Sequence, residues 1–356
     1  MEIKEYLLKD ICKFETGIDP LLSEKNGNFP FIKLGNTTGN KINYDFSEKI
    51  NTNRKEMAKN GDLLLCWSCS VGKSFIVEKD CFFSTAFYKL INLKNIYLNK
   101  YLYYFFQKNE NIISKLAIGS VLKKANMNIL GNYKVNLPNI KTQQKIINII
   151  EPFENLKSKI LKNKNKLINF IDSVYKYISS NSQKEITLLS FANLFNKKYL
   201  NQNLYVETSN INENMSITNT LKNITKNKKP SRANLSVAQN SLIFSKLIGS
   251  KKIFPIYDCN YTLYVYSTGF YNISANELNW YLLGFLNSKD FEIQKNNNSS
   301  GTLMEGITIE GLKKVKLKIP NENYELNIIL KLISKLNLML KNIDEIINKL
   351  IQLYVV

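Results

Sequence analysis

The chain has 356 residues, of which 44% are hydrophobic, so it is long enough for two or three domains with buried cores. Its 49 Lys and Arg residues outnumber 29 Asp and Glu residues, and the formal net charge is +20. This excess indicates a polyanionic partner, with nucleic acid first and an anionic membrane surface second, although a Lys- and Asn-rich coding bias explains part of it.

Several classes of protein are excluded or disfavoured by the residues that are missing. The sequence contains no histidine, which excludes Ser-His-Asp and Cys-His catalysis, zinc sites built on histidine and HNH nucleases. No uninterrupted apolar run reaches the roughly 18 residues of a membrane span, and charges interrupt the apolar N-terminal stretch, unlike in a signal peptide. Five irregularly spaced cysteines fit a reducing cytoplasm, where we expect the protein to reside.

The first half of the chain predicts a mixed region of short strands, loops and one helix. Leu63–Leu65 and Phe82–Ile91 are apolar runs with the length and composition of buried strands. A short helix is expected over Asn99–Lys108. A strand over Tyr133–Pro138 ends in proline and closes the globular part.

The pattern then changes to a long helix over residues 141–182. Pro152 interrupts it and is placed at the first turn of the main rod, after a short helix Lys141–Ile150. Asn163 is the one polar residue of the apolar seam, either fixing register or lying in a solvated defect. The seam alternates in steps of three and four through Ile146, Ile149, Phe153, Leu156, Ile160, Asn163, Leu167, Phe170, Val174 and Tyr177.

The second half predicts the same order of elements. Strands are expected over Leu242–Phe244 and Tyr261–Ile273, a short helix over Glu277–Leu286, and a strand over Lys314–Pro320. A second long helix covers residues 322–356. Its seam is apolar throughout: Leu326, Ile329, Ile333, Leu336, Leu340, Ile343, Ile347, Leu350 and Tyr354.

A strict 3.5-residue period held for about four heptads is typical of a coiled-coil seam. We therefore expect the two helices to pair with each other as antiparallel rods. About 28 residues at a rise of 1.5 Å give a rod of roughly 40 Å, close to one turn of B-DNA. Two globular units held that far apart would bind a split site with an unread gap.

The two halves are an internal repeat. FSTAFYKL (Phe83–Leu90) recurs as YSTGFYNI (Tyr266–Ile273), and NYKVNLP (Asn132–Pro138) is matched by KKVKLKIP (Lys313–Pro320). Three further matches follow the same order at an offset of about 180 residues, which is too long for a solenoid. The predicted fold class is therefore α+β and pseudo-two-fold, with mixed α/β domains over 1–140 and 183–321 and helices over 141–182 and 322–356.

No motif in the sequence predicts a catalytic, metal or cofactor site in this chain. Gly72-Lys73-Ser74 resembles the end of a P-loop, but Trp67 occupies the position where the motif requires glycine. Cys66 and Cys69 form a single CxxC pair with no second pair to complete a zinc site. The sequence also contains no methyltransferase motif and no convincing acidic cluster for a two-metal nuclease.

The basic residues supply the candidate DNA contacts. Arg54 and Arg232 are the two arginines and occupy equivalent positions in the repeat, which favours phosphate anchoring over base reading, with a repeated Arg–carboxylate structural pair as the alternative. Base specificity is expected where the copies differ: Lys33–Lys41, Lys123–Asn128, Thr208–Asn214, Lys226–Arg232 and Lys246–Lys252. The candidate DNA-binding residues are Lys33, Asn36, Lys41, Arg54, Lys73, Lys123, Lys124, Asn210, Lys226, Lys228, Lys229, Arg232, Lys246, Lys251 and Lys252.

Together these features resemble the specificity subunit of type I restriction-modification systems. The resemblance covers nearly the whole chain. It depends on the ordered combination of Gly61-Asp62-Leu63-Leu64, the STxFY strand, the YLYY-type helix, Gly119-Ser120, a strand ending in L-P or I-P, Gln143-Gln144-Lys145-Ile146, YVETSNIN (Tyr205–Asn212) and KKPSRANL (Lys228–Leu235). Copy two departs from this pattern, because it lacks the Gly-Asp pair and the double Gln before its long helix.

The resemblance implies a non-catalytic DNA reader with one target-recognition domain for each half of an asymmetric site. It also implies that the helices set the gap and dock two modification subunits that carry S-adenosylmethionine, and that a restriction subunit joins for cleavage. Two alternatives remain open at this point: a nuclease or methyltransferase with an unrecognised carboxylate site, and a coiled-coil interaction protein whose charge is only compositional bias.

Overall fold

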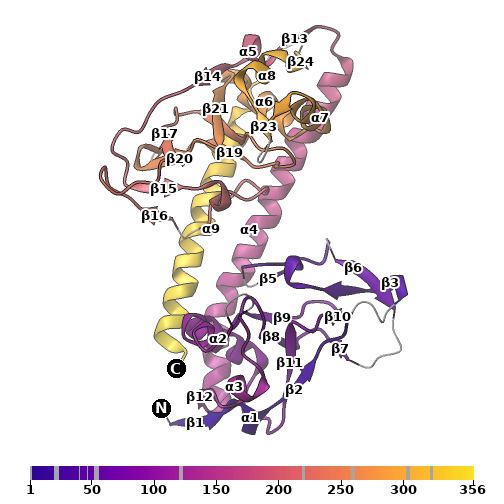
Figure 1. Ribbon diagram of the computed structural model, residues 1–356, viewed down its shortest axis with the longest axis vertical. Coiled ribbons are helices and arrows are strands. Elements are labelled where there is room, and N and C mark those ends of the chain that lie inside the picture. Colours follow the sequence, from indigo (N-terminus) through magenta and orange to yellow (C-terminus); the bar gives the residue numbers. More distant parts are fainter. Residues whose placement is uncertain are drawn as a thin grey trace. The chain divides into compact units, whose positions relative to one another are not determined.

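In the computed structural model the described residues are 2–19, 24–39, 41–45, 47–51, 56–119, 123–218, 221–257, 261–301, 305–320 and 324–356. They form two compact units. Unit 1 consists of Met1–Glu154 and Glu345–Val356, and unit 2 of Asn155–Asp344. This division passes through both long helices, so each unit contains a globular part and a segment of each helix (Figure 1).

Unit 1 contains two four-stranded sheets (Figure 1). One has the order β2-β11-β8-β9 and is antiparallel, and the other has the order β6-β3-β10-β7 with β3 and β10 parallel. The buried Leu63–Leu65 run lies in β8, an inner strand, as its lack of polar positions predicts. The bounds are β1 Ile3–Leu7, β2 Cys12–Thr16, β3 Glu24–Ile32, β4 Thr37–Thr38, β5 Lys41–Ile42, β6 Glu48–Asn51, β7 Met57–Ala58, β8 Leu63–Cys66, β9 Ser74–Ile76, β10 Cys81–Phe83, β11 Phe87–Asn92, β12 Lys134–Pro138, α1 Leu8–Ile11, η2 Leu34–Asn36, α2 Asn99–Ser114 and α3 Met127–Gly131.

Unit 2 repeats this topology. Its sheets have the orders β14-β21-β18-β19 and β16-β15-β20-β17, again with one parallel pair, β15 and β20. The bounds are β13 Glu185–Thr187, β14 Asn193–Phe195, β15 Leu204–Val206, β16 Lys222–Asn223, β17 Ala233–Leu235, β18 Ser241–Ser245, β19 Ile253–Ile256, β20 Tyr264–Ser267, β21 Phe270–Ser274, β22 Ser299–Ser300, β23 Gly306–Ile307, β24 Lys316–Lys318, α5 Leu188–Phe191, η3 Thr208–Asn210, η4 Tyr261–Leu263, η5 Asn276–Leu278, α6 Asn279–Asn287, α7 Lys289–Asn297 and α8 Ile309–Lys314.

The matching strand orders confirm the repeat and the α+β fold class. A two-stranded pair also closes each unit, β1 with β12 and β13 with β24. The long apolar stretches 82–91 and 261–273, however, are each divided. β10 and β11 belong to different sheets, as do β20 and β21, so the chain must turn between them at Ser84–Ala86 and Thr268–Gly269. Apolar runs alone do not show such a turn.

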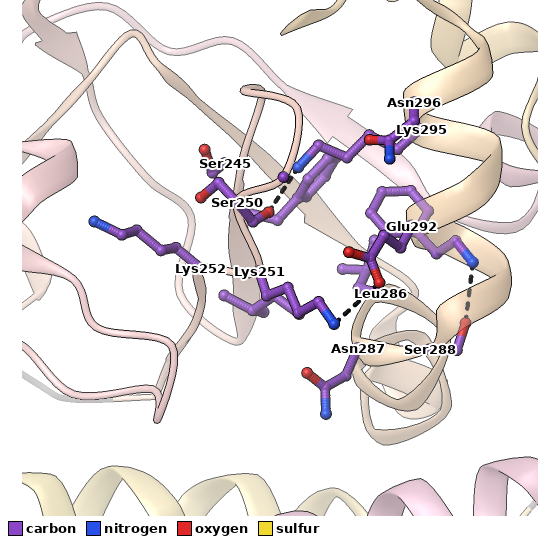
Figure 2. A pocket seen from close by; sticks show the side chains of 14 residues that line it. Ser245, Ser250, Lys251, Lys252, Leu286, Asn287, Ser288, Glu292, Lys295 and Asn296 are labelled. Atoms are coloured by element: carbon purple, nitrogen blue, oxygen red, sulfur yellow. Dashed lines mark hydrogen bonds and ion pairs between the residues drawn. The ribbon is translucent and has the colours of Figure 1, made fainter. Parts of the chain in front are cut away.

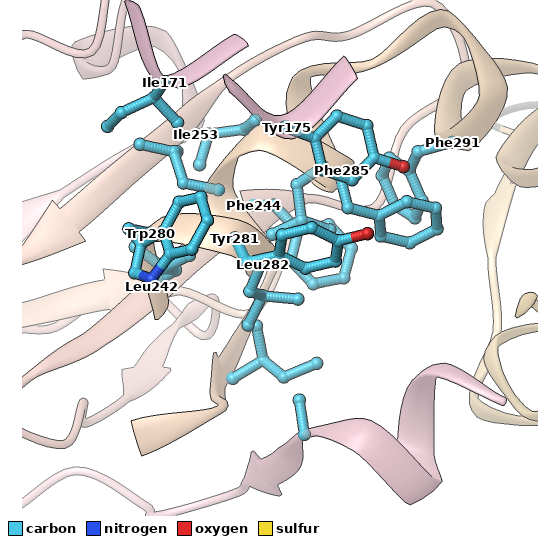
Figure 3. Packing of buried hydrophobic residues seen from close by; sticks show 14 of the residues in the cluster. Ile171, Tyr175, Leu242, Phe244, Ile253, Trp280, Tyr281, Leu282, Phe285 and Phe291 are labelled. Carbon is cyan, nitrogen blue, oxygen red and sulfur yellow. The ribbon is translucent and has the colours of Figure 1, made fainter. Parts of the chain in front are cut away.

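The core of unit 2 combines a long helix with the sheet (Figure 3). Tyr175 of the first long helix, α4 (Ile140–Asn181), lies with its ring centroid 4.9 Å from that of Tyr281 and 6.3 Å from that of Phe285, both on α6. Gly284 allows this approach, because a Cβ there would lie 2.4 Å from the Cβ of Tyr175. Leu242 and Phe244 of β18 pack into the same cluster.

Helix α4 continues without interruption through Pro152, so the predicted break between a short helix and the main rod is wrong. Proline removes one backbone hydrogen bond, to the carbonyl of Asn148. Both Pro152 and Asn148 are exposed, so that carbonyl can be solvated by water. The helix therefore tolerates proline at this position.

The predicted seam of α4 is wrong at every second position. Leu156 and Phe170 are 43% and 50% exposed, and Asn163 is exposed, whereas Lys164 and Ile171 are fully buried. Ile149 and Tyr177 are exposed as well, at 40% and 73%. The other predicted positions are buried (Ile146 and Ile160) or half-buried (Phe153, Leu167 and Val174). Apolar residues occur at adjacent positions along this helix, so two neighbouring faces are both apolar. The packing of Tyr175 against α6 buries the face that contains Ile171 instead of the predicted one.

The second long helix, α9 (Asn327–Tyr354), buries or half-buries its predicted seam except at Tyr354, which is 40% exposed. Ile333, Leu340, Ile343 and Ile347 are buried, and Leu336 and Leu350 are half-buried. Within unit 2, Lys157 contacts Asp344 and Lys164 contacts Asn337, so the two helix segments lie side by side and run in opposite directions (Figure 1). No helix among the described residues is long and apolar enough to cross a membrane.

Candidate nucleic-acid interface

A hydrogen-bonded turn follows the central strand β3 of unit 1. The Asn36 Oδ1 atom accepts a hydrogen bond from the Lys33 backbone N–H at 2.9 Å, and the Asn43 N–H donates to the Asn36 carbonyl at 2.7 Å. The Lys33 Nζ atom lies 2.9 Å from a carboxylate oxygen of Glu48, on the edge strand β6. Lys33 was a predicted contact, whereas its acidic partner was not.

The loop after β8 forms a second cluster in unit 1. The Trp67 ring stacks on Tyr88 with centroids 5.3 Å apart, and the Lys124 Nζ atom lies 5.8 Å from the Trp67 ring centroid. The Cys69 N–H donates to the Lys123 carbonyl at 2.9 Å. Lys73 is half-buried at the end of this loop. The structure therefore brings Lys123 and Lys124 to the same loop as Lys73, beside an aromatic pair that sequence reasoning missed.

Unit 2 has the equivalent turn after β15. The Asn210 Oδ1 atom accepts from the Glu207 N–H at 2.8 Å, and the Thr218 N–H donates to the Asn210 carbonyl at 2.8 Å. The Lys222 Nζ atom lies 2.5 Å from a Glu207 carboxylate oxygen. Hydrogen bonding and the charge of Lys222 lower the pKa of Glu207, and the pKa of Lys222 is raised in return.

The loop after β18 in unit 2 carries three of the predicted lysines. The Lys246 Nζ atom lies 4.2 Å from the Tyr271 ring centroid, and burial lowers the pKa of Lys246. Lys251 forms an ion pair with Glu292 at 3.0 Å (Figure 2), and Lys252 donates to the Thr208 carbonyl at 2.8 Å. These charges are held by protein partners, so their contribution to phosphate binding is smaller than their number suggests.

A buried lysine that the sequence did not single out lies beside this loop. The Lys295 Nζ atom donates to the Ser250 carbonyl at 2.8 Å (Figure 2), and Lys295 is 4% exposed. Burial lowers its pKa to about 8. It lines a small cavity of about 20 Å³ between the loop and α7, the size of one water molecule.

The segment before β17 presents further cations. Lys226, Lys228 and Arg232 are exposed, and their side chains make no hydrogen bond or ion pair with other described residues. The Lys229 Nζ atom lies 5.1 Å from the Tyr199 ring centroid and donates to the Ala233 carbonyl. In unit 1, Lys41 and Lys123 are likewise exposed. Arg54 lies outside the described residues, so its predicted equivalence to Arg232 stays a prediction.

The amide oxygens of Asn36 and Asn210 cap turns, and the predicted contact of these residues with DNA stays a prediction. Their shared position was visible in the sequence as IKLGN (residues 32–36) against VETSN (206–210). Among the described residues, no group of three or more Cys, Asp and Glu side chains is placed to hold a metal ion. Cys12, Cys66, Cys69 and Cys81 are free thiols.

Comparison with known proteins shows which family the first half of the chain resembles. Residues 1–169 match the family model described as the type I restriction modification DNA specificity domain. Over its first half, this chain is similar to the type I restriction-modification specificity family. Members of the family similar to this chain include a putative type I restriction enzyme specificity subunit of Haemophilus influenzae, 30% identical over 142 residues, and a type I restriction enzyme specificity subunit of Methanocaldococcus jannaschii, 27% identical over 105 residues.

These alignments cover 38% and 30% of this chain, and 35% and 25% of the two relatives. The similarity of fold extends further along the chain. The crystal structure of a type I restriction-modification system S subunit from M. genitalium has a TM-score of 0.54 and 14% identity, and the match covers 98% of this chain and 93% of that one. The similarity of fold to that structure therefore includes unit 2 as well as unit 1.

Proposed function

We propose that this chain is the non-catalytic DNA-recognition subunit of a type I restriction-modification complex. Each unit reads one half of an asymmetric, bipartite site in double-stranded DNA. The observation that carries the proposal is that the two units share one topology yet present different side chains at equivalent loops. For example, Trp67 stacks on Tyr88 in unit 1, whereas at the equivalent place in unit 2 the Lys246 ammonium lies over the Tyr271 ring. Two units with the same backbone fold but different loop side chains are suited to reading two different half-sites.

The equivalence of these two positions is supported by their backbone contacts. The Trp67 N–H donates to the Ala86 carbonyl, and the Trp67 carbonyl accepts from Ala125. The Lys246 N–H donates to the Gly269 carbonyl, and the Lys246 carbonyl accepts from Ile307. Base edges differ in their donors, acceptors and methyl groups, so an aromatic ring and a cation at one position favour different bases.

The two long helices, in this proposal, set the gap between the half-sites and dock modification subunits, two per chain. Their surface supports a docking role, because large apolar side chains lie exposed along α4 and α9. Exposed apolar patches commonly mark protein interfaces. They include Leu156 at 43%, Phe170 at 50% and Tyr177 at 73% on α4, and Leu338 at 41%, Met339 at 47% and Leu353 at 72% on α9.

The chemistry of the complex belongs, in the proposal, to its other subunits. The modification subunits would hold S-adenosylmethionine and methylate adenine, and restriction subunits would join for cleavage. The contribution of this chain is selection of the DNA sequence. The net charge of +20 supports a phosphate-binding role that is independent of base sequence.

The test is selection of bound duplexes from a randomised DNA library by the chain in complex with its modification subunit. The proposal predicts two short blocks of preferred bases separated by a gap of fixed length. Binding to the selected duplex should weaken with salt, with a slope of log affinity against log salt of about −5 to −7 if six to eight phosphates are contacted. A flat salt response, or one continuous preferred block, would contradict the proposal.

A further inference from the structure

Two exposed ion pairs occur at equivalent places in both units. One keeps its lysine and glutamate at the same positions in the two units, whereas the other exchanges them. The first joins the strands that close each unit. The Lys134 Nζ atom lies 2.8 Å from Glu5 in unit 1, and the Lys316 Nζ atom lies 3.9 Å from Glu185 in unit 2. β1 pairs with β12 as β13 pairs with β24, so these pairs are equivalent. In both units the glutamate lies on the first strand of the pair and the lysine on the second.

The second pair is reversed between the units. It joins the turn after the central strand to the start of the edge strand. In unit 1 the turn supplies the cation, Lys33, and the edge strand supplies the anion, Glu48. In unit 2 the turn supplies the anion, Glu207, and the edge strand supplies the cation, Lys222.

The strand register shows that the reversed positions are equivalent. Glu48 lies opposite Phe31 in the pairing of β6 with β3, two residues before Lys33. Lys222 lies opposite Tyr205 in the pairing of β16 with β15, two residues before Glu207. The parallel neighbours agree, because Ile32 pairs with Phe83 in unit 1 as Val206 pairs with Tyr266 in unit 2.

The backbone of the turn is the same in both units. An asparagine amide oxygen caps the N–H of Lys33 in one unit and of Glu207 in the other, at 2.9 and 2.8 Å. A short 3-10 helix follows in each, η2 and η3. Two identical frames thus present opposite charges at one position.

Stability alone does not explain the reversal. An exposed ion pair contributes little to folding in either orientation. The side chains remain accessible, with 41% and 60% exposure for Lys33 and Glu48, and 31% and 65% for Glu207 and Lys222. The closing pair, which has the same cross-strand character, keeps one orientation. The charge reversal is therefore a difference between the units at an accessible position of a shared frame.

We infer that Lys33 and Glu207 are equivalent specificity-determining residues, one for each half-site. This inference rests on the proposed function. The Lys33 ammonium is a donor only and favours the O6 and N7 acceptors of guanine. The Glu207 carboxylate is an acceptor only and favours the exposed amino group of cytosine or adenine. Glu48 and Lys222 hold these side chains in place before DNA binds.

The test uses charge-swap variants that keep each ion pair while reversing its direction. They are K33E/E48K in unit 1 and E207K/K222E in unit 2, with K134E/E5K as the matched control. Each full-length variant, in complex with the modification subunit, selects duplexes from the randomised library, and its thermal unfolding is measured in parallel. The single variants K33A and E207A serve if a swapped chain fails to fold, because they remove one charge without introducing another.

The inference predicts that K33E/E48K changes preference in one block only, from guanine towards cytosine or adenine, by about tenfold at one base pair. E207K/K222E should produce the opposite change in the other block, and the control should select the wild-type sequence. The alanine variants should weaken preference at the same base pair. Unchanged preferences in folded variants would overturn the inference while leaving the proposed function intact. A wild-type complex that selects no sequence would overturn both.

Discussion

Lys164 on α4 donates a hydrogen bond to the Oδ1 atom of Asn337 on α9, at 2.8 Å. Asn337 in turn donates to the Met215 carbonyl at 2.7 Å, so within unit 2 the paired helices are tied to the loop that contains Met215. Lys164 is fully buried, and it forms no ion pair with a carboxylate in the described part of the chain. A buried polar pair of this kind costs stability and commonly fixes the register of two helices.

Because Lys164 is buried, its titration makes the unfolding free energy depend on pH, and a Lys164 variant can isolate this contribution. Burial lowers the pKa of Lys164 from 10.5 to about 8. Below pH 8 the lysine is charged in both the folded and unfolded states, and the cost of burying the charge is fully present. Between pH 8 and 10.5 the folded state loses the proton first, so the unfolding free energy rises.

We therefore expect the unfolding free energy of the wild type to rise relative to that of K164M by on the order of 2 to 3 kcal/mol between pH 8 and 10.5. Denaturant unfolding at several pH values measures this difference. K162M, at an exposed position on the same helix, should show no such change relative to the wild type. The wild type has to be compared with K164M, because Lys295 also has a pKa of about 8 and its titration adds to the rise in the unfolding free energy of both proteins. A constant difference between wild type and K164M would show that Lys164 is not the titrating group.

The register of α4 provides a second prediction. Ile171 is fully buried and Phe170 is 50% exposed, although the heptad spacing predicted the reverse. I171A should lower the unfolding free energy by about 2 to 5 kcal/mol, because it leaves a cavity in the core of unit 2. F170A should lower it by less than about 1 kcal/mol. If I171A and F170A lowered the unfolding free energy equally in denaturant unfolding, the result would contradict the burial of Ile171 on the inner face of α4.

This difference shows what the sequence can and cannot specify. The repeat, both long helices and the inner strands β8 and β18 follow from local apolar patterns and were predicted. The buried face of α4 was not, because its apolar residues occur in adjacent pairs and only tertiary packing, through Tyr175 against α6, selects between them. In α9 apolar residues are also adjacent in places, as at Ile346-Ile347, but there most of the predicted heptad positions are the buried ones.

The candidate contacts show the same limit. Lysines at loops that differ between the copies were found from the sequence, but the turn-capping role of Asn36 and Asn210 was not. Glu48 and Lys222 were missed because an ion pair joins segments that are separated in sequence. Aligning the copies at an offset of 174 residues, which places Lys33 over Glu207 and Glu48 over Lys222, would have revealed the charge reversal.

The end of α9 depends on one lysine in unit 1. The Lys108 Nζ atom donates to the carbonyls of Gln352 and Val355, at 3.2 and 2.5 Å. These carbonyls have no partner within the helix, and a cation there also interacts favourably with the helix dipole. K108M should therefore destabilise the last helical turn by about 1 kcal/mol.

Hydrogen exchange measured by mass spectrometry on peptides from residues 345–356 checks this prediction, with faster exchange expected in K108M. K115M, at an exposed position near the end of the same helix α2, is the control and should exchange like the wild type. Unchanged protection in K108M would mean that packing against α2 alone holds the helix end.

The two capping asparagines provide a fourth prediction. N36A and N210A each remove the amide oxygen that accepts from a backbone N–H, so each should lower the unfolding free energy by about 1 kcal/mol. DNA affinity should fall, because the turn that carries Lys33 or Glu207 loosens. The preferred base sequence should stay the same, as measured by selection from a randomised library. A changed base preference would instead show that the asparagine itself reads the DNA.

The central claim is that each of the two units reads one half of a split DNA site. Protection mapping of a selected duplex, bound by the chain with its modification subunit, tests it most directly. The account predicts two short protected base-contact blocks around a gap whose sequence can be changed without loss of affinity. Mutating the DNA of one block should leave protection of the other block detectable at higher protein concentration. One continuous block, or a gap whose sequence matters as much as the blocks, would contradict the account.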